Sequence, residues 1–241
     1  MLVTGGGSGL GADLARGFAT AGAQVVVTGR RAAPLEAVAA SAARISAHTA
    51  DVTDEAELIR LFDAFEPFDV VVANAGTAAS APLTKTSLEL WEHVLAVNLT
   101  GVFVTLREGL RRMRGREWGR LITIASVAGL KGYPYIAAYT ASKHGAVGLT
   151  RAVAQEVASS GITANALCPG YLATEMTERT IANIVDATGR SESDAIEALL
   201  QFNPQRRLIE PPEVTAAALW LCAPGSESIN GQAIAIAGGE L

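Results

Sequence analysis

The sequence has little of what marks several classes of protein. Its 241 residues include only two cysteines, Cys168 and Cys222, far apart and without a CxxC spacing, so we expect reduced thiols rather than a disulfide framework. Charged residues make up 18% and the net charge is -5, which leaves no basic face for nucleic acid. No window approaches the ~18 uninterrupted apolar residues of a membrane span, and no signal-peptide pattern follows Met1. These absences favour a cytoplasmic protein that binds neither membranes nor nucleic acid.

The chain is instead rich in apolar residues and glycine. Hydrophobic residues make up 49%, and 24 residues are glycine. Such a hydrophobic chain with a modest net charge is not expected to be disordered, and its glycines have no period of three that would indicate collagen. A chain of this length buries enough surface to fold without disulfides or metals.

Short apolar runs alternate with helical stretches along the whole chain. Runs such as 25–27 and 69–73, bounded by turn residues, are typical of strands buried on both faces. We predict strands over 2–4, 24–28, 45–51, 69–73, 120–125, 163–167 and 233–237. Helices are predicted over 9–21, 33–43, 88–94, 101–113, 136–159 and 211–221, with another beginning at 53–55.

This rhythm predicts an α/β fold with about seven parallel strands in a doubly wound sheet, covered by helices on both faces. No linker or internal repeat divides the chain, so residues 1–241 are predicted to form a single domain. Residues 174–205 break the rhythm with helical patterning and no strand. An excursion of this kind after a strand end predicts a small helical lid over a site.

A glycine-rich loop joins the first predicted strand to the first helix: Thr4-Gly5-Gly6-Gly7-Ser8-Gly9-Leu10-Gly11. Glycines allow a tight turn and a close approach of the backbone to a pyrophosphate, and the free N–H groups at the start of the helix attract its charge. Alone, the loop is also compatible with a plain structural turn. Its strand-loop-helix context favours a dinucleotide site, and no Gly-Lys-Ser/Thr follows that would indicate a P-loop.

The end of the second predicted strand indicates which dinucleotide is bound. An acidic residue there would bind the two ribose hydroxyls of NAD, but the chain has Gly29 followed by Arg30 and Arg31. A guanidinium suits a 2′-phosphate, which favours NADP(H) over NAD(H). The alternative is a pair of solvated surface arginines. Arg30 is the stronger candidate because it directly follows the strand end.

A group of polar residues is expected to meet at the carboxyl edge of the sheet, where open α/β sheets bind their ligands. Tyr139 and Lys143 are spaced i and i+4, which places them one turn apart on one face of a helix. Ser126 and the segment Asn74-Ala75-Gly76 each follow a predicted strand, and Asn98 lies in the helical region between them.

Together these motifs resemble the short-chain dehydrogenase/reductase family over nearly the whole chain. They comprise the Thr4–Gly11 loop, Asp51, Asn74-Ala75-Gly76, Asn98, Ser126, Tyr139-x-x-x-Lys143, Pro169-Gly170 and Thr174. Within that family the chain looks similar to the 3-oxoacyl-thioester reductases, which act on acyl-carrier-protein or CoA substrates. The resemblance implies a Rossmann-type fold and an NAD(P)-dependent enzyme acting on CH–OH groups.

The resemblance also implies roles for individual residues. Tyr139 would be the general acid in reduction and the base in oxidation, aided by the charge of Lys143 because a tyrosine of pKa near 10 is otherwise a poor base. Ser126 would bind the substrate oxygen, and Asn98 would hold a water that relays protons from Lys143. The residues implied in cofactor binding are Thr4, Gly5, Gly7, Ser8, Gly9, Leu10, Gly11, Arg30, Arg31, Asp51, Val52, Asn74, Ala75, Gly76, Tyr139, Lys143, Pro169, Gly170, Leu172 and Thr174.

The substrate pocket is expected to be mostly apolar. Its expected lining is Val127-Ala128-Gly129-Leu130, Tyr133, Tyr135, Tyr171 and the lid. The related 3-hydroxybutyrate dehydrogenases hold a carboxylate with polar residues where this chain has Thr77-Ala78-Ala79 and Val127-Ala128-Gly129. A neutral ketone or thioester is therefore favoured, unless a basic lid residue such as Arg179 reaches the substrate.

Other polar residues are assigned structural roles. His144 projects about 100° from Lys143 on the helix, and His48 and His93 have no partners at ligand spacing, so no metal site is predicted. The basic stretch Arg111, Arg112, Arg114 and Arg116 is interpreted as a solvated helix end, with docking of an acidic carrier or CoA phosphate as the alternative. The chain has Ala73 and Ala237 where relatives often carry Asn and Asp, and it starts close to the glycine loop, so a short first strand is expected.

The sequence thus predicts an NADP(H)-dependent oxidoreductase that transfers hydride between nicotinamide and a ketone or secondary alcohol. The expected substrate is a 3-oxoacyl thioester or another hydrophobic ketone. The alternatives are an NAD-dependent 3-hydroxyacid or alcohol dehydrogenase and, with less support, a non-catalytic cofactor-binding module. The family resemblance implies a homotetramer or homodimer, with helices 101–113 and 136–159 and the final strand at the interfaces.

Overall fold

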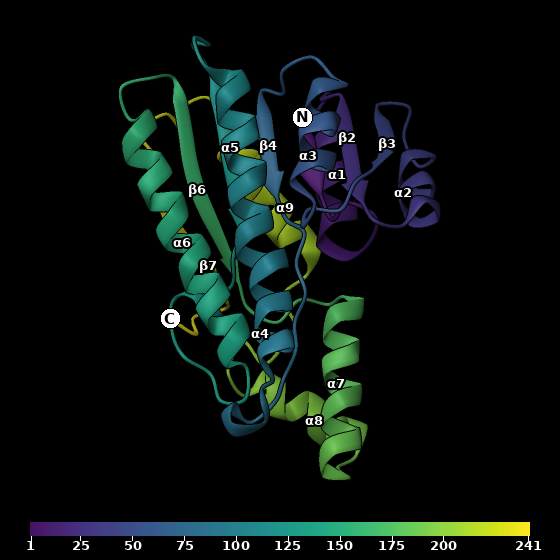
Figure 1. The fold of residues 1–241 in the computed structure, drawn as a ribbon. Coiled ribbons are helices and arrows are strands. Elements are labelled where there is room, and N and C mark those ends of the chain that lie inside the picture. Colours follow the sequence, from purple (N-terminus) through teal and green to yellow (C-terminus); the bar gives the residue numbers. More distant parts are fainter.

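The computed structural model describes residues 1–241 and contains one seven-stranded parallel sheet (Figure 1). Its strand order is β3-β2-β1-β4-β5-β6-β7, so the order reverses between β1 and β4. The strands are β1 (Leu2–Thr4), β2 (Val25–Gly29), β3 (Ile45–Thr49), β4 (Val70–Ala73), β5 (Gly119–Ile124), β6 (Ile162–Pro169) and β7 (Ala233–Ile236). The predicted α/β class, strand number and parallel pairing are confirmed.

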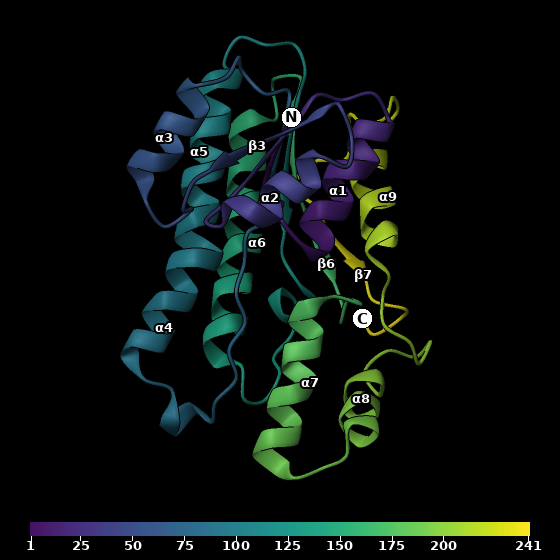
Figure 2. The same ribbon diagram turned by 90° about the vertical axis from the view of Figure 1, so that its right-hand side faces the viewer.

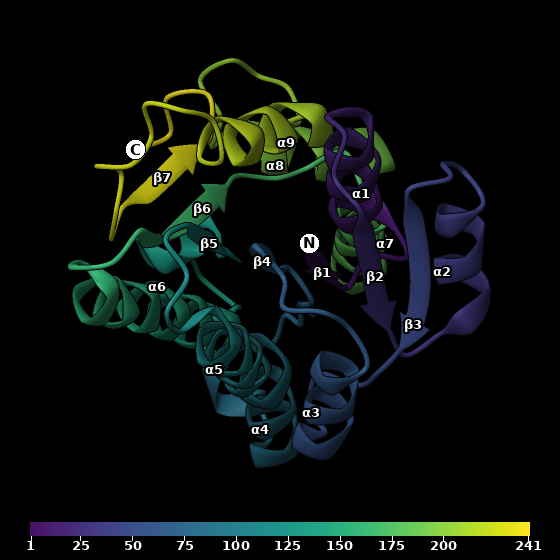
Figure 3. The same ribbon diagram turned by 90° about the horizontal axis from the view of Figure 1, so that it is seen from above.

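Helices cover both faces of the sheet (Figure 3). They are α1 (Gly9–Thr20), α2 (Ala32–Ala39), α3 (Glu55–Asp63), α4 (Leu88–Leu95), α5 (Gly101–Met113), α6 (Ala137–Val157), α7 (Glu175–Thr188), α8 (Glu192–Leu200) and α9 (Pro211–Trp220). Three short elements are η1 (Leu83–Lys85), the π-helical turn η2 (Ala96–Thr100) and η3 (Val127–Gly129). No helix combines the length and the hydropathy that a membrane span requires.

Two hydrophobic cores lie on opposite faces of the sheet because neighbouring strand residues point to opposite sides. In β2, Val25 and Val27 pack into the core beneath α1, α2 and α9, whereas Val26 packs into the core beneath α3, α5 and α6. Val72 and Val71 of β4 divide in the same way. Burial on both faces explains why central strands such as β2 and β4 are continuous apolar runs rather than alternating patterns.

Two helix boundaries differ from the predictions for local reasons. The predicted helix over 33–43 ends at Ala39, where the backbone N–H and the hydroxyl of Ser41 both bond the carbonyl of Val38 and close a turn. The predicted helices over 88–94 and 101–113 are joined without a break by the π-helical turn Ala96–Thr100. No pattern in the sequence predicts this π-helical turn.

The excursion predicted over 174–205 is a helical hairpin of α7 and α8 that projects beyond the carboxyl edge of the sheet (Figure 2). Helix α7 ends at Gly189, whose φ of 68° is the left-handed conformation that favours glycine. A small core of Ile181, Ala195 and Leu199 holds the two helices together.

Most of the basic stretch at the end of α5, Arg111 to Arg116, is engaged in ion pairs within the chain. Its pairs are Arg111–Glu108, Arg112–Glu108, Arg112–Asp63 and Arg116–Asp69. The side chain of Glu108 is only 1% exposed, and it also accepts a hydrogen bond from Nε of Arg107 at 2.9 Å. This pairing gives the arginines a role in the fold and supports the interpretation of the stretch as a helix end rather than a docking site.

Replacing Glu108 with Gln is expected to lower the free energy of unfolding by about 2 kcal/mol, because a buried charged acceptor shared by three arginines is lost. Glu55→Gln is the matched control, since Glu55 pairs with Arg107 while its side chain is 58% exposed, and exposed pairs contribute less than about 1 kcal/mol. Urea denaturation measures both values. Equal losses in the two variants would contradict a special role for Glu108.

Candidate active site

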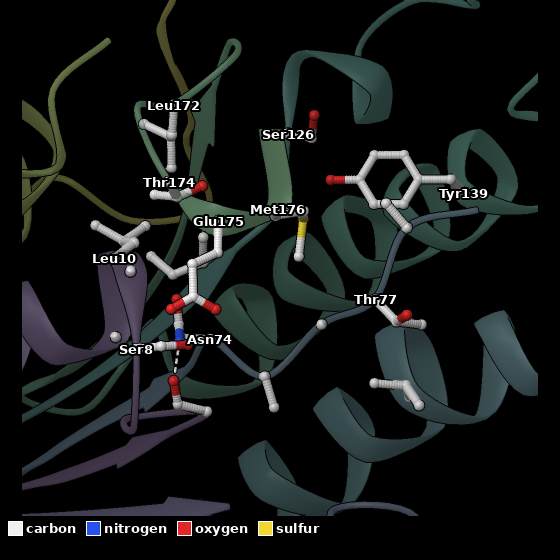
Figure 4. Close-up of a pocket in the computed structure, with 18 of the residues that line it drawn as sticks. Ser8, Leu10, Asn74, Thr77, Ser126, Tyr139, Leu172, Thr174, Glu175 and Met176 are labelled. Atoms are coloured by element: carbon white, nitrogen blue, oxygen red, sulfur yellow. Dashed lines mark hydrogen bonds between the residues drawn. The ribbon is translucent and has the colours of Figure 1, made fainter. Parts of the chain in front are cut away.

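A cavity of about 470 Å³ opens at the carboxyl edge of the sheet, between the glycine loop and the lid (Figure 4). One end is formed by the loop Gly5–Gly11 and by the residues after β2 and β3. The other end is formed by the segment after β5, the start of α6 and the first turns of α7. The cavity is therefore long enough to connect a phosphate-binding loop to a polar group at its far end.

The glycine loop turns so tightly that side chains would not fit at three of its positions, Gly5, Gly6 and Gly11. Gly5 has a φ of 64°, and a Cβ there would lie 2.8 Å from the Cα of Ala75. A Cβ on Gly11 would lie 2.2 Å from the carbonyl oxygen of Gly5. The loop consequently folds back against the first turn of α1 and leaves a concave backbone surface on the cavity side.

The start of α1 has the donors that a phosphate needs. Its N-cap residue Ser8 makes no side-chain capping hydrogen bond, and no acidic residue lies in the first turn. The first backbone N–H groups of an uncapped helix carry a partial positive charge and bind anions. The glycine cradle and these donors together fit the pyrophosphate of a dinucleotide.

Asn74 connects the loop to β4. Its amide nitrogen donates to the carbonyl oxygens of Thr4 and Gly5, at 2.8 and 3.2 Å. The backbone N–H groups of Asn74 and Ala75 both donate to the hydroxyl of Thr4 at 3.0 Å. Thr4 is buried and does not line the cavity, so its place is beneath the loop and not among the cofactor contacts expected from the sequence.

Arg30 and Arg31 are exposed at the end of β2 and line the same cavity as Asp51 and Val52. The carboxylate of Asp51 accepts hydrogen bonds from the N–H and the hydroxyl of Thr53, at 2.9 and 2.8 Å. Partial burial alone would raise the pKa of Asp51, but these bonds and the nearby charge of Arg30 hold that pKa below its usual value. This end of the cavity therefore combines a fixed carboxylate with two free guanidinium groups.

Ser126, Tyr139 and Lys143 lie together at the other end of the cavity. Figure 4 shows the hydroxyl of Tyr139 beside Ser126, with Met176 of the lid facing the same space. The Oγ of Ser126 accepts a hydrogen bond from the N–H of Ala128 at 3.1 Å, which leaves its own hydrogen free to be donated. Lys143 extends from one turn further along α6, and its Nζ donates to the carbonyl oxygen of Ile124 at 2.8 Å.

Burial shapes the acid–base properties of this group. Removal from water raises the pKa of Tyr139 to about 12, although a hydrogen bond from Ser126 acts in the opposite direction. Burial lowers the pKa of Lys143 to about 8. The phenol is thus protonated at neutral pH, and Lys143 is cationic there but close to its titration range.

Asn98 lies behind the wall of the cavity rather than in it. It sits in the π-helical turn η2 and is fully buried. Its amide group exchanges two 2.8 Å hydrogen bonds with the backbone of Thr77 and donates to the hydroxyl of Ser142 at 3.1 Å. The side chain thereby fixes the strand-end segment opposite Lys143; the expected water relay stays a prediction.

The structure brings the other predicted site residues to the cavity. Those that line it are Gly5, Gly7, Ser8, Gly9, Leu10, Gly11, Arg30, Arg31, Asp51, Val52, Asn74, Ala75, Gly76, Ser126, Tyr139, Lys143, Pro169, Gly170, Leu172 and Thr174. Thr4 and Asn98 are the two predicted residues that do not. Both instead hydrogen-bond the segments that do.

At the substrate end, only part of the expected lining is present. Val127, Ala128, Tyr133 and Tyr171 face the cavity, whereas Gly129, Leu130 and Tyr135 do not. Tyr135 has a φ of 68° and a 65% exposed side chain. Ser80, Val97 and Ile136 line the cavity although the sequence did not single them out, and His93 lines it although no site role was assigned to it. The lid, which was expected in the lining, contributes Glu175, Met176, Thr177, Thr180 and Asn183. The spacing of Met176, Thr180 and Asn183 indicates one face of a helix, but the sequence does not show that α7 turns this face toward the cavity.

His144, the absence of a metal-binding cluster and the two cysteines complete the description of the groups considered in the sequence. His144 lies away from the cavity, with Nδ1 2.9 Å from the carbonyl oxygen of Thr140. No group of three or more His, Cys, Asp or Glu side chains is placed to hold a metal ion. Cys168 is buried and Cys222 half-buried, both as free thiols.

Comparison with protein families and curated proteins gives a consistent result. The family model described as short chain dehydrogenase matches residues 1–184. The chain is 35% identical to the D-beta-hydroxybutyrate dehydrogenase of Rhizobium meliloti, over 99% of this chain and 96% of that protein. It is 37% identical to the 3-oxoacyl-[acyl-carrier-protein] reductase of a Synechocystis strain, over 99% and 95% respectively.

The fold is also similar to solved structures. A variant of the actinorhodin polyketide ketoreductase, solved with NADPH, superimposes with a TM-score of 0.95 at 34% identity. That match covers 99% of this chain and 95% of the other. Levodione reductase superimposes with a TM-score of 0.93 at 33% identity, covering 99% and 96%.

The lowered pKa of Lys143 predicts a specific dependence of stability on pH. Between pH 8 and the ordinary lysine pKa of 10.5, the folded state holds fewer protons at this site than the unfolded state, so folding becomes more favourable as the pH rises. Lys143→Met removes this contribution. The stability of the wild type relative to this variant is therefore expected to increase from pH 7.5 to pH 10 in urea titrations.

The control is Lys85→Met, because Lys85 is exposed. Its difference from the wild type is expected to stay constant over the same pH range. A constant difference for Lys143→Met as well would contradict the lowered pKa.

Proposed function

Because the chain belongs to the short-chain dehydrogenase family of oxidoreductases, which act on secondary alcohols and ketones, we propose that it is an NADP(H)-dependent member reducing a hydrophobic ketone. A 3-oxoacyl thioester is the substrate class that we favour. The reaction is reversible in principle, with the same residues acting on the alcohol.

One observation carries this proposal. A tyrosine hydroxyl, a serine hydroxyl and a buried lysine, from Tyr139, Ser126 and Lys143, share one cavity with a glycine cradle that fits a pyrophosphate. The first three can bind and protonate a carbonyl oxygen, and the cradle can hold a nicotinamide dinucleotide within the same cavity. A nicotinamide, when bound, supplies or accepts the hydride.

The chain's own residues would manage the proton. Ser126 has its acceptor side occupied by the N–H of Ala128, so it would donate its hydrogen to the carbonyl oxygen and hold it beside Tyr139. Tyr139 would then give its proton to that oxygen as negative charge develops. Lys143, one turn along α6, would stabilise the resulting tyrosinate with its positive charge.

The preference for NADP(H) rests on Arg30 and Arg31. They are the two basic side chains exposed at the end of β2 in the cavity, and their neighbour Gly29 has no carboxylate that would bind the ribose hydroxyls of NAD. The similar ketoreductase solved with NADPH supports the same choice. We expect Asp51 and Val52 to contact the adenine end of the cofactor and Pro169 and Thr174 to contact its nicotinamide end. All four line the cavity.

The preference for a hydrophobic ketone rests on the substrate end. Val127, Ala128, Ile136 and Met176 give it apolar walls, and the similar Synechocystis protein is a 3-oxoacyl reductase. The similarity to a D-beta-hydroxybutyrate dehydrogenase favours a 3-hydroxyacid as the second candidate. Arg179 is the one basic lid residue in the lining, and its partner Glu175 lies 3.4 Å away.

Assembly into a homotetramer or homodimer is part of the proposal. Phe103 on α5 and Trp220 on α9 are large apolar side chains that are 43% and 49% exposed. Strand β7 is an edge strand with a free hydrogen-bonding side. The two apolar side chains and the free strand edge are the contacts that we propose for further copies of the chain.

Tyr139→Phe is expected to reduce kcat for ketone reduction by roughly a hundred- to ten-thousand-fold, because the general acid is lost. The assay follows NADPH and NADH oxidation with 3-oxoacyl-CoA thioesters, free 3-oxoacids and cyclic ketones. Tyr135→Phe is the matched control, since Tyr135 lies four residues earlier and outside the cavity. Full activity in Tyr139→Phe would refute the proposed mechanism, and no reduction of any ketone by the wild type would refute the proposed function.

Arg30→Ala is expected to weaken NADPH binding by about tenfold, the size of one lost hydrogen bond to a charged group. NADH binding should not change, because NADH lacks the 2′-phosphate. Fluorescence titration of both cofactors measures the two dissociation constants, with Arg16→Ala as a control on the outside of α1. An unchanged ratio of the two constants in Arg30→Ala would remove the argument for NADPH.

A further inference from the structure

The segment that follows β7, Gly238–Glu240, places a buried carboxylate behind the substrate end of the cavity. The side chain of Glu240 is only 3% exposed. Its Oε1 accepts a hydrogen bond from the hydroxyl of Tyr133, and Nζ of Lys131 lies 3.1 Å from the same oxygen. The carboxylate thus has one hydrogen-bond donor, Tyr133, and one neighbouring cation, Lys131. Both belong to the segment that follows the turn at Ser126.

The same segment packs against the end of the lid. Gly238 has a φ of 62°, and a Cβ there would lie 2.0 Å from Oδ1 of Asn203. A Cβ on Gly239 would lie 3.6 Å from Pro204. Asn203 is itself buried and donates to the carbonyl oxygen of Arg207 at 2.7 Å, so it has no room to move aside.

Tyr133 links these contacts to the cavity. Its ring lines the cavity and meets the ring of Phe202, at the end of the lid, edge to face with centroids 5.5 Å apart. A Cβ on Gly170, beside the cavity residue Tyr171, would lie 3.6 Å from Oε2 of Glu240. Three segments therefore meet around Glu240 at the substrate end: 131–133, 170–171 and 202–204. Its carboxylate contacts the first directly and lies beside Gly170 of the second, and it reaches the third through Tyr133 and through its own neighbours Gly238 and Gly239.

We propose that Glu240 is a positioning residue that sets the shape and selectivity of the substrate end. By accepting the hydrogen of Tyr133, it turns that hydroxyl away from the substrate and leaves the aromatic ring as the wall. Through Tyr133 and Phe202, it also holds the end of the lid against that wall. The resulting preference for hydrophobic substrates rests on the proposed function. The claim that Glu240 holds the three segments in place does not depend on it.

The first experiment compares Glu240→Ala with the wild type. We expect KM for a 3-oxoacyl-CoA thioester to rise about tenfold, as when a hydrogen bond to a charged group is lost, with a smaller change in kcat and no change in the Kd for NADPH. Hydrogen–deuterium exchange should become faster in residues 131–136, 170–172 and 199–205 and stay unchanged elsewhere. Glu240→Gln should give an intermediate KM, because its amide oxygen still accepts from Tyr133 while the attraction to Lys131 is lost.

Two further variants make the test specific. Leu241→Ala changes the neighbouring residue, which is 54% exposed, and should leave KM and exchange unchanged. In Tyr133→Phe the donor is absent, so adding Glu240→Ala to it should raise KM by less than Glu240→Ala does in the wild type. Additive effects would contradict an action through Tyr133.

The inference is overturned if Glu240→Ala leaves KM and local exchange unchanged. It is equally overturned if exchange rises throughout the chain and the Kd for NADPH rises with KM, because the residue would then support the fold in general. If the wild type reduces no ketone, the proposed function fails, and the exchange comparison alone decides whether Glu240 fixes the three segments.

Discussion

The hydrogen bonds from Asn74 to the backbone of Thr4 and Gly5 hold the site together at the place where the strand order reverses. Strands β1 and β4 are neighbours there, but the chains leaving them turn to opposite faces of the sheet, which opens a crevice between them. One amide side chain closes the base of that crevice. The position of the glycine loop relative to the groups that face it across the cavity depends on this connection.

Much of the fold and of the site followed from the sequence because the signals were local. Apolar runs and helical periodicity predicted about seven parallel strands, and the i, i+4 spacing of Tyr139 and Lys143 predicted one shared helix face, which lines the cavity. Features that depend on distant segments did not follow. The bracing role of Thr4, the π-helical turn and the contacts of Glu240 each need a partner that sequence spacing does not reveal.

The proposed catalytic end of the cavity combines two opposed requirements. In the proposed mechanism Lys143 must stay charged near Tyr139, yet the dry surroundings that strengthen such an interaction also disfavour the charge. The carbonyl oxygen of Ile124 accepts a hydrogen bond from Lys143 at 2.8 Å and offsets part of that cost. The arginines around the buried carboxylate of Glu108 lie on another part of the molecule and show the alternative arrangement, in which cations surround a carboxylate.

Because of the π-helical turn between α4 and α5, one continuous helical segment contributes side chains both to the cavity and to the hydrophobic core. A π turn contains one residue more than an α turn, so the residues after Thr100 are rotated around the axis relative to those before Ala96. His93, before the turn, and Val97, within it, can therefore face the cavity, while the half after the turn places Val104 and Leu106 in the core. A straight α-helix of the same length would have a single apolar stripe and could face only one of them.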